Sequence, residues 1–364
     1  MSQALFVSST PGLEPALAEE LSELGFKGRE VAGGVELTAP DGAYREINLW
    51  SRIASRVLLR VAAVSEPGEL SRVSLDPYGR TFALELGEGT GRFKAALARW
   101  GVSPPAGRST DVSALPGGPG RSGPASTEAS SSVPTLHARM DSGRCVLSVD
   151  TSGELLYLRG YRQEVGRAPL RETLAAGILR LAGWRPGEPL WDVMCGSGTI
   201  LIEAAEQCAG LAPGRARHFA FEGFPSHDEG AWLALARERP ATDTPLFGSD
   251  LNAGALGTAR RNAKRAGVLE RLTLERLDAT KLPQRPGPGL VIANLPYGKR
   301  VGEKSELAVL YRGLGQSIRR LGPSWRFAFL LEEGALHLGL PFQRSFAVKN
   351  GGLRCELVTG RLEA

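Results

Sequence analysis

The chain has 364 residues, 42% of them hydrophobic, so it can bury a large core and is expected to form two or three domains. No uncharged apolar run approaches the roughly 20 residues that span a bilayer, and no basic-then-apolar leader is recognisable, so we expect a cytoplasmic protein with no membrane partner. The net charge is +5, but residues 1–160 carry 16 Lys and Arg against 18 Asp and Glu, whereas residues 161–364 carry 28 against 21. The second half is therefore the part expected to meet a polyanion.

The four cysteines give no sign of a metal site. They form no C-x-x-C pair, and the four histidines do not lie at zinc-ligand spacings from them. Reduced thiols and no metal are the expectation.

Residues 1–65 are predicted to form a small ferredoxin-like α+β domain. We expect a strand over residues 4–8, a helix over 12–24, a strand around 31–38 and a second helix over 44–60. Leucines recur at helical spacing in the first helix, which predicts one buried stripe.

Residues 66–160 are predicted to form a second domain that begins and ends with strands. The strand-like segments are residues 80–86, 136–140, 145–150 and 154–160. Between them, 27 of the 35 residues from Gly101 to Thr135 are Gly, Pro, Ser, Thr or Ala. Such a segment has little to bury against its ordering entropy, so we expect it to be disordered or a mobile loop.

Residues 161–364 alternate between helices and strands, which predicts an α/β, doubly wound Rossmann-like domain. Helices are expected at residues 170–184, 199–210, 253–267 and 305–321, and strands at 189–195, 246–250, 272–278, 290–296 and 326–332. A final hairpin of residues 345–350 and 353–360, turning at Gly351 and Gly352, is expected to add two antiparallel strands.

The first candidate site is the sequence DVMCGSGTILIEAA, which starts at Asp192. Small residues follow a strand and open a helix, so a ligand could approach the backbone there. The third glycine of a dinucleotide fingerprint is absent, and so is the Gly-Lys-Ser/Thr of a phosphate loop. Taken alone, the turn could also be a tight connection without a ligand.

Three successive strands each end near an acid, at Asp192, Asp250 and Asp278. A carboxylate after the second strand suits a ribose diol, and one after the third could accept from an adenine amino group. The alternative is three unrelated helix caps. The pattern favours an adenosine compound without a bound pyrophosphate.

The second candidate site is Asn294-Leu295-Pro296-Tyr297, at the end of an apolar strand. An exocyclic base amine is a poor nucleophile because its lone pair is delocalised, and acceptors aimed at its hydrogens would favour attack on a methyl group. The Asn294 side-chain oxygen and the Leu295 carbonyl could be those acceptors, with Pro296 fixing the turn and Tyr297 stacking on the flipped base. The alternative is a simple turn.

These motifs together resemble the class I, S-adenosylmethionine-dependent RNA methyltransferases that carry a THUMP domain and methylate guanine N2. The similarity extends to ELLYLRGYR, PLRETLAAGILRLAGW and KNGGLRCEL, while LFVSSTPGLEPALAEEL and INLWSRIASRVLLR are similar to the ferredoxin-like opening of the bacterial large-subunit ribosomal RNA enzyme in that group. The resemblance implies a THUMP-like RNA-binding region at residues 66–160 and a methyltransferase domain at residues 161–364.

The resemblance also implies roles for individual residues. The catalytic set would be Asn294, Leu295, Pro296 and Tyr297, and S-adenosylmethionine would contact Thr173, Asp192, Cys195, Gly196, Ser197, Gly198, Asp250 and Asp278. The RNA-binding candidates are Arg159, Arg162, Lys299, Arg300 and Lys349. We expect a monomer that acts on ribosomal or transfer RNA.

Departures from the family pattern keep alternatives open. Leu295 stands where the family usually has proline, and N-L-P-Y also resembles ribosomal RNA adenine dimethyltransferases, so an adenine-N6 methyltransferase on RNA or DNA is the nearest alternative. The Gly, Pro and Ser-rich stretch and the acidic balance of residues 1–160 suggest that RNA capture has moved to the catalytic half. They also permit a non-catalytic RNA-binding or assembly factor.

Overall fold

The computed structural model describes residues 2–102, 133–164, 170–237, 239–285, 287–296, 304–333 and 338–362. The chain separates into two compact units, each described here by itself. The first contains Met1–Thr10, Leu17–Leu158 and Pro213–Arg237, and the second contains Pro11–Ala16, Arg159–Ala212 and Glu238–Ala364. The segment predicted to be disordered falls mainly on residues 103–132, which lie outside the described residues.

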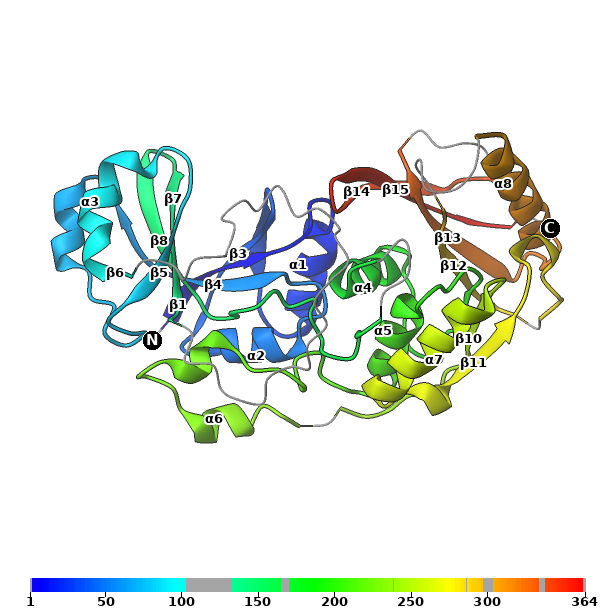
Figure 1. The fold of residues 1–364 in the computed structure, drawn as a ribbon, viewed down its shortest axis with the longest axis horizontal. Coiled ribbons are helices and arrows are strands. Elements are labelled where there is room, and N and C mark those ends of the chain that lie inside the picture. Colours follow the sequence, from blue (N-terminus) through cyan, green and yellow to red (C-terminus); the bar gives the residue numbers. More distant parts are fainter. Residues whose placement is uncertain are drawn as a thin grey trace. The chain divides into compact units, whose positions relative to one another are not determined.

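The first unit is built on one eight-stranded sheet in the order β2-β3-β1-β4-β8-β7-β5-β6. This sheet runs through both predicted N-terminal domains, so the division at residue 65 stays a prediction. Its strands are β1 (Ser2–Ser8), β2 (Gly28–Val31), β3 (Gly34–Pro40), β4 (Arg56–Val64), β5 (Phe82–Leu86), β6 (Gly101–Val102), β7 (Thr135–Asp141) and β8 (Arg144–Asp150). The helices α1 (Glu14–Glu23), α2 (Ala43–Trp50), α3 (Lys94–Leu97) and α6 (Glu229–Leu233) accompany them (Figure 1).

Two predicted elements of this unit are wrong. The helix expected over residues 44–60 ends at Trp50, and Arg56–Val64 form strand β4. Its valines and leucines fit a strand that pairs with β1 and β8, and this pairing overrides the helical spacing. The strand expected over residues 154–160 is irregular chain.

Residues 213–237 return to the first unit although the second unit surrounds them in sequence. An aromatic cluster holds them there. The rings of Phe221 and Tyr44 lie 5.5 Å apart edge to face, those of Phe221 and Trp232 lie 5.1 Å apart, and Phe224 meets Tyr78 at 5.7 Å. The pattern of predicted helices and strands did not indicate that residues 213–237 belong to the first unit.

The second unit is a seven-stranded sheet in the order β11-β10-β9-β12-β13-β15-β14. Strands β9 to β13 are parallel, and β15 pairs antiparallel with both β13 and β14, as predicted. The strands are β9 (Leu190–Asp192), β10 (Leu246–Asp250), β11 (Leu272–Arg276), β12 (Gly289–Asn294), β13 (Trp325–Glu332), β14 (Arg344–Asn350) and β15 (Leu353–Arg361).

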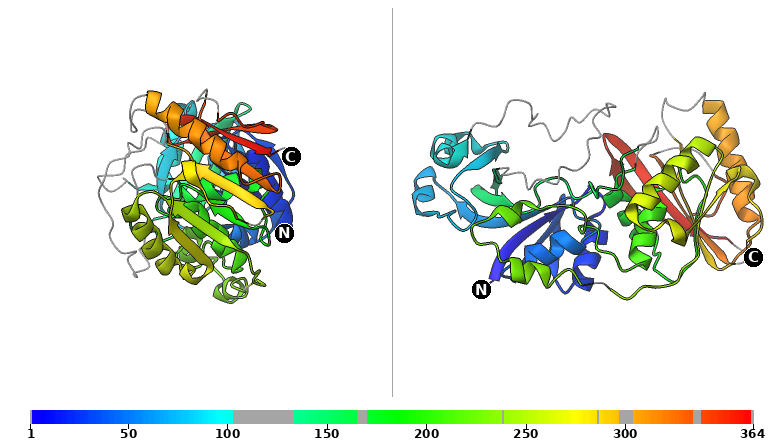
Figure 2. Two further views of the ribbon diagram at one scale, coloured as in Figure 1. Left: turned by 90° about the vertical axis from the view of Figure 1, so that its right-hand side faces the viewer. Right: turned by 60° about the horizontal axis from the view of Figure 1, so that its bottom comes forward.

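Helices cover both faces of this sheet. α4 (Glu172–Leu181), α5 (Thr199–Cys208) and α7 (Ala253–Ala266) lie on one face, and α8 (Lys304–Arg319) lies on the other (Figures 1 and 2). Alternate residues of β12 point to the two faces, and Val291, Ala293 and Leu295 pack against the α8 side chains Leu314 and Ile318. The predicted fold class is confirmed. Within the described ranges no helix is long and apolar enough to cross a membrane.

Candidate active site

The predicted site residues gather where the strand order of the second sheet reverses. β9 pairs parallel with β12, with Asp192 opposite Ile292, while β10 and β11 continue on one side and β13 on the other. Asp192, Asp250 and Asn294 are the last residues of β9, β10 and β12. Ligands of open parallel sheets bind outside the carboxyl ends of the strands at such a switch point.

The turn after β9 is held by hydrogen bonds from its own backbone. The Cys195 amide donates to the Ser249 carbonyl at 2.9 Å, the Gly196 amide donates to Asp250 Oδ2 at 3.0 Å, and the Gly198 amide donates to the Cys195 carbonyl at 2.8 Å. The Cys195 thiol is buried, which raises its pKa, and the backbone of this residue forms the hydrogen bonds that hold the turn.

The two glycines of the turn, Gly196 and Gly198, differ in what surrounds them. Both have positive φ, +53° at Gly196 and +85° at Gly198, which disfavours any other residue. A Cβ on Gly198 would lie 3.1 Å from Ala259 Cβ, because α7 packs directly against the turn. A Cβ on Gly196 would meet nothing within 4 Å, so the turn is open on that side and has room for a ligand.

The three acids have different environments. Asp192 is 1% exposed, and burial raises its pKa to about 8 despite a 3.3 Å hydrogen bond from the Met194 amide. Asp250 accepts from the amides of Gly196 and Asn252, the latter at 2.8 Å.

Asp278 differs from both because it caps the short 3-10 helix Ala279–Lys281. Hydrogen bonds from the hydroxyl and the amide of Thr280 lower its pKa. A cap was the alternative for all three acids, and it describes Asp278.

Asn294 is half-buried, and its side-chain Oδ1 is fully buried without a hydrogen-bond partner among the described residues. The Leu295 amide donates to the Leu330 carbonyl at 2.9 Å, and its side chain is buried in the core, which anchors the turn. The Pro296 carbonyl accepts from the Tyr311 hydroxyl of α8 at 2.9 Å. Tyr297 lies outside the described residues.

Thr173 is the second residue of α4 and is 1% exposed. Its hydroxyl oxygen is buried and has no hydrogen-bond partner in the described part of the chain. Unsatisfied buried polar atoms are rare in folded proteins. Two such atoms lie on predicted site residues, the hydroxyl oxygen of Thr173 and the side-chain oxygen of Asn294.

The RNA-binding candidates are not all on the surface. Arg159 is 4% exposed and pairs with the buried Glu203, with Nε and Oε1 at 3.3 Å. Arg162 pairs with Glu172 at 2.9 Å, and burial raises the pKa of that carboxyl to about 7. Both arginines thus have partners inside the domain, and contact with phosphate would require breaking these pairs.

The other three candidates divide between surface and undescribed chain. The Lys349 side chain is exposed on β14, while its amide donates to the Pro11 carbonyl at 3.1 Å. Lys299 and Arg300 lie outside the described residues.

Two further residues shape the site and were not predicted. The Asn262 side chain of α7 is fully buried and donates to the Ser197 carbonyl of the turn at 3.2 Å, and Tyr311 holds the turn after β12. The sequence could have indicated Asn262, because it lies on the same buried face of α7 as Leu256, Ala259 and Ala266. A polar side chain buried among apolar residues needs a hydrogen-bond partner.

The residues present fit an adenosine cofactor. The open side of Gly196 gives room beside the backbone, and the orphaned Thr173 hydroxyl offers hydrogen bonding. Asp250 has about four lone-pair sites, of which the two amides occupy two. Across the described residues, no group of three His, Cys, Asp or Glu side chains could hold a metal ion.

A Rossmann-like sheet with this strand order and an open Gly-rich turn after its first strand defines the class of protein as a nucleotide-cofactor enzyme of the methyltransferase type. Residues 159–349 match the family described as the RMKL-like methyltransferase domain, and residues 4–58 match the RlmL ferredoxin-like domain. The chain belongs to the RMKL-like methyltransferase family, as the sequence motifs predicted.

The curated relatives include the ribosomal RNA large subunit methyltransferase K/L of Chromohalobacter salexigens, which is 35% identical over 97% of this chain and 52% of that protein. The protein of the same name from Photobacterium profundum is 34% identical over 99% of this chain and 53% of its own length. The chain therefore spans about half the length of the curated relatives it matches.

Solved structures match the whole chain. A possible methylase from Clostridium difficile has a TM-score of 0.84 and 27% identity, covering 100% of this chain and 99% of that one. A predicted N6-adenine-specific DNA methylase from Listeria monocytogenes has a TM-score of 0.80 at 24% identity, covering 99% and 96%. The second likeness shows a shared fold and leaves the target base open.

Proposed function

We propose that the chain is an S-adenosylmethionine-dependent RNA methyltransferase that modifies the exocyclic N2 of a guanosine, in 23S ribosomal RNA or in transfer RNA. The observation that carries the proposal is the buried, unpartnered Oδ1 of Asn294 at the end of β12, beside the Gly-rich turn of β9. An acceptor without a partner at a switch point is suited to a ligand that brings a donor.

The cofactor supplies an electrophilic methyl group on a sulfonium. Gly196 provides space for it, Asp250 accepts from the ribose hydroxyls, and Asp278 contacts the adenine through the oxygen that Thr280 does not occupy. Asp192 and Thr173 offer a buried carboxyl and a buried hydroxyl to the same ligand.

Asn294 and Leu295 act on the target amine. The Asn294 Oδ1 and the Leu295 carbonyl accept its two hydrogens, which favours the tetrahedral nitrogen that attack requires. Because the amine loses its proton only after transfer, no strong base is needed. Tyr311 fixes the turn through the Pro296 carbonyl, so both acceptors are positioned before the base arrives.

The choice of guanine N2 follows the family resemblance, whereas the names of the curated relatives support only a ribosomal RNA substrate. Mass spectrometry of nucleosides from RNA of a deletion strain tests it. We expect loss of N2-methylguanosine, restored by the wild-type gene. Loss of N6-methyladenosine with N2-methylguanosine intact would establish the adenine alternative, and no change in either, with no affinity for S-adenosylmethionine by calorimetry, would favour a non-catalytic factor.

A further inference from the structure

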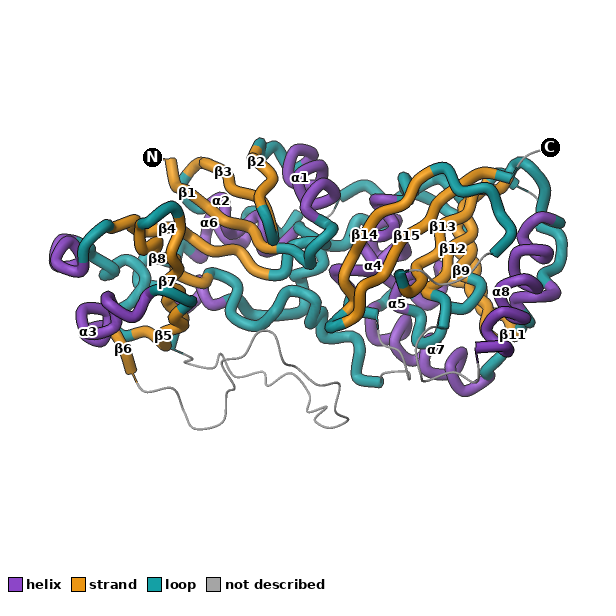
Figure 3. Tube along the Cα trace, turned by 90° about the horizontal axis from the view of Figure 1, so that it is seen from above, coloured by secondary structure: helices purple, strands orange, loops and turns teal. Residues whose placement is uncertain are grey.

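One face of the first unit's sheet is free of helices in the described part of the chain. Leu5, Val7, Val35 and Leu37 are buried on the other face, which α2 covers. In Figure 3 the strands β1, β3, β4, β8 and β7 lie toward the viewer, with α2 and α6 behind them. We call the helix-free side the open face.

Arginines gather on the open face. The strand register places Arg29 of β2, Glu36 of β3 and Phe6 of β1 side by side in one row on this face. Arg60 of β4 lies in the next row, opposite Ala4 of β1. Arg29 and Arg60 both donate to Glu36, at 2.8 Å and 2.7 Å, and these pairs lower the pKa of that carboxyl. One carboxylate is therefore shared by two guanidinium groups.

A third arginine lies against the same row. The guanidinium carbons of Arg60 and Arg139 lie 5.6 Å and 4.9 Å from the centroid of the Phe6 ring. These cation-π contacts keep both groups on the sheet. Arg139 is exposed and makes no ion pair with the residues that the structure describes. The cluster Arg29, Arg60 and Arg139 thus carries two positive charges more than Glu36 neutralises.

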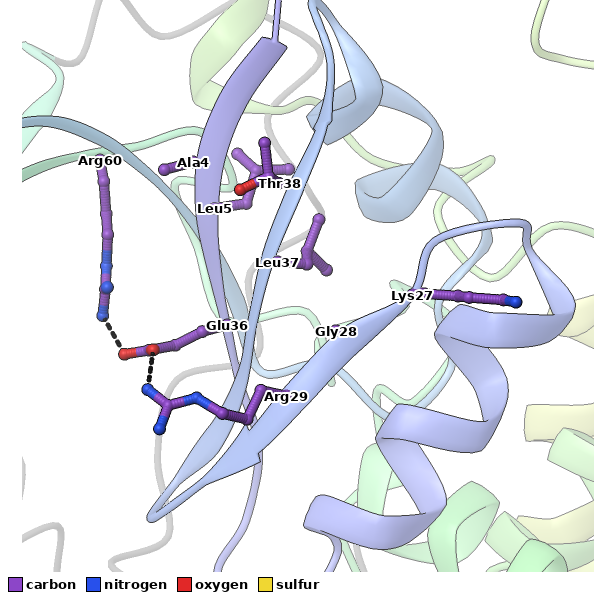
Figure 4. A pocket seen from close by; sticks show the side chains of 9 residues that line it. All are labelled: Ala4, Leu5, Lys27, Gly28, Arg29, Glu36, Leu37, Thr38 and Arg60. Carbon is purple, nitrogen blue, oxygen red and sulfur yellow. Dashed lines mark hydrogen bonds and ion pairs between the residues drawn. The ribbon is translucent and has the colours of Figure 1, made fainter.

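A pocket of about 450 Å³ lies beside the two ion pairs. Figure 4 shows Arg60, Glu36 and Arg29 on one side of the strands, with Ala4, Gly28 and Thr38 nearby. Small side chains leave this room. Each guanidinium has five N–H donors, of which the carboxylate uses one, so most of the donors are available to a second anion.

Two other carboxylates of the open face have partners of their own, because Glu85 contacts His137 Nδ1 at 2.8 Å and Asp150 pairs with Arg56. Further acids of this unit lie on helix α1. Helix α1 carries Glu19, Glu20 and Glu23 and no basic residue in its last turn, and Glu20 binds Ser51 and the Arg52 amide beyond the end of α2. The Debye length is about 8 Å at physiological ionic strength, which is less than the thickness of a sheet and a helix layer. An anion on the open face is therefore screened from the carboxylates of α1.

We propose that the open face, through Arg29, Arg60 and Arg139, binds the sugar-phosphate backbone of the RNA substrate. The inference rests on the proposed function in taking RNA as the partner, and it assigns RNA capture to the part of the chain whose summed charge is negative. Arginine forks match phosphate oxygens in pairs, and Glu36 holds two of the forks in place.

Fluorescence anisotropy with a fluorescein-labelled RNA hairpin that has a single-stranded flank tests the proposal across a salt series. The double variant Arg29→Glu/Arg139→Glu changes two exposed side chains and should weaken binding by about 10-fold or more, with the salt slope reduced by about 2. Glu36→Gln should strengthen binding by about 3-fold, because it removes the carboxylate that neutralises Arg29 and Arg60. A gain in affinity cannot come from misfolding.

The matched control is Arg72→Glu/Lys94→Glu, which reverses two exposed charges elsewhere in the same unit and should change affinity by less than about 2-fold. Equal losses in both double variants, or an unchanged Arg29→Glu/Arg139→Glu variant, would overturn the proposal. The proposal would also be overturned if the Arg29→Glu/Arg139→Glu variant lost binding to phosphatidylglycerol vesicles while its affinity for RNA stayed unchanged. A wild-type protein that binds RNA through this face but transfers no methyl group would refute the proposed function alone.

Discussion

Replacing Asn294 by alanine should separate catalysis from stability. No hydrogen bond joins the Asn294 side chain to the residues that the structure describes, and its Oδ1 is buried without a partner. The Asn294→Ala substitution therefore leaves no donor or acceptor unpaired, and we expect the free energy of unfolding to change by about 1 kcal/mol or less. Loss of one transition-state acceptor should lower turnover by a factor of about 10² to 10³, which corresponds to about 2.7 to 4 kcal/mol.

The assay is single-turnover transfer of radiolabelled methyl groups to RNA, with cofactor affinity measured by calorimetry and stability by urea denaturation. Asn48→Ala is the contrasting variant, because buried Asn48 hydrogen-bonds to the Tyr44 carbonyl, Thr151 and Ser152 in the first unit. It should cost about 2 to 4 kcal/mol of stability and leave cofactor affinity intact. Unchanged turnover in Asn294→Ala would remove the acceptor role.

Three further substitutions test the rest of the site. Thr173→Val, which removes an unpartnered buried hydroxyl, should leave the melting temperature equal or higher and weaken cofactor binding by about 10-fold in calorimetry. Tyr311→Phe should lower turnover by about 10-fold at unchanged cofactor affinity, because the Pro296 carbonyl loses its anchor; equal kinetics would contradict this. Asp192 is held protonated up to a pKa of about 8, so without ligand the native state binds more protons than the unfolded chain, and stability should fall from about pH 5 to pH 8. Asp192→Asn should show a smaller fall in urea denaturation at the two pH values, and equal slopes would refute the buried carboxyl as its cause.

The second unit could be predicted from sequence because its strands are short apolar runs separated by amphipathic helices. The buried residues of β12 and β13 are apolar on both faces, which is typical of a parallel sheet covered by helices. Positions at strand ends then follow from the fold, since the carboxyl ends of parallel strands share one edge. The structure places Asp192, Asp250 and Asn294 at such strand ends, and their roles stay predictions.

The first unit was harder to predict because antiparallel pairing leaves a weaker local signal. The segment Arg56–Val64 has apolar residues at spacings that suit a helix as well as a strand, and only its partners β1 and β8 decide the outcome. The return of residues 213–237 depends on rings that are far apart in sequence, such as Tyr44 and Phe221. Contacts of this kind have no local periodicity to reveal them.

Charged and polar side chains were the least predictable part of the site, because their role depends on what lies opposite them. Arg159 was expected to face RNA but meets Glu203, 44 residues further along the chain, in a buried pair. Asn262 was not singled out from the sequence, yet it lies on the buried side of α7 and donates to the Ser197 carbonyl. Buried polar atoms are nearly always hydrogen-bonded, so the positions of Arg159 and Asn262 are set by the partners that the fold places opposite them. Under the proposed function, the unpartnered oxygens of Thr173 and Asn294 are the places where a ligand would supply the donor.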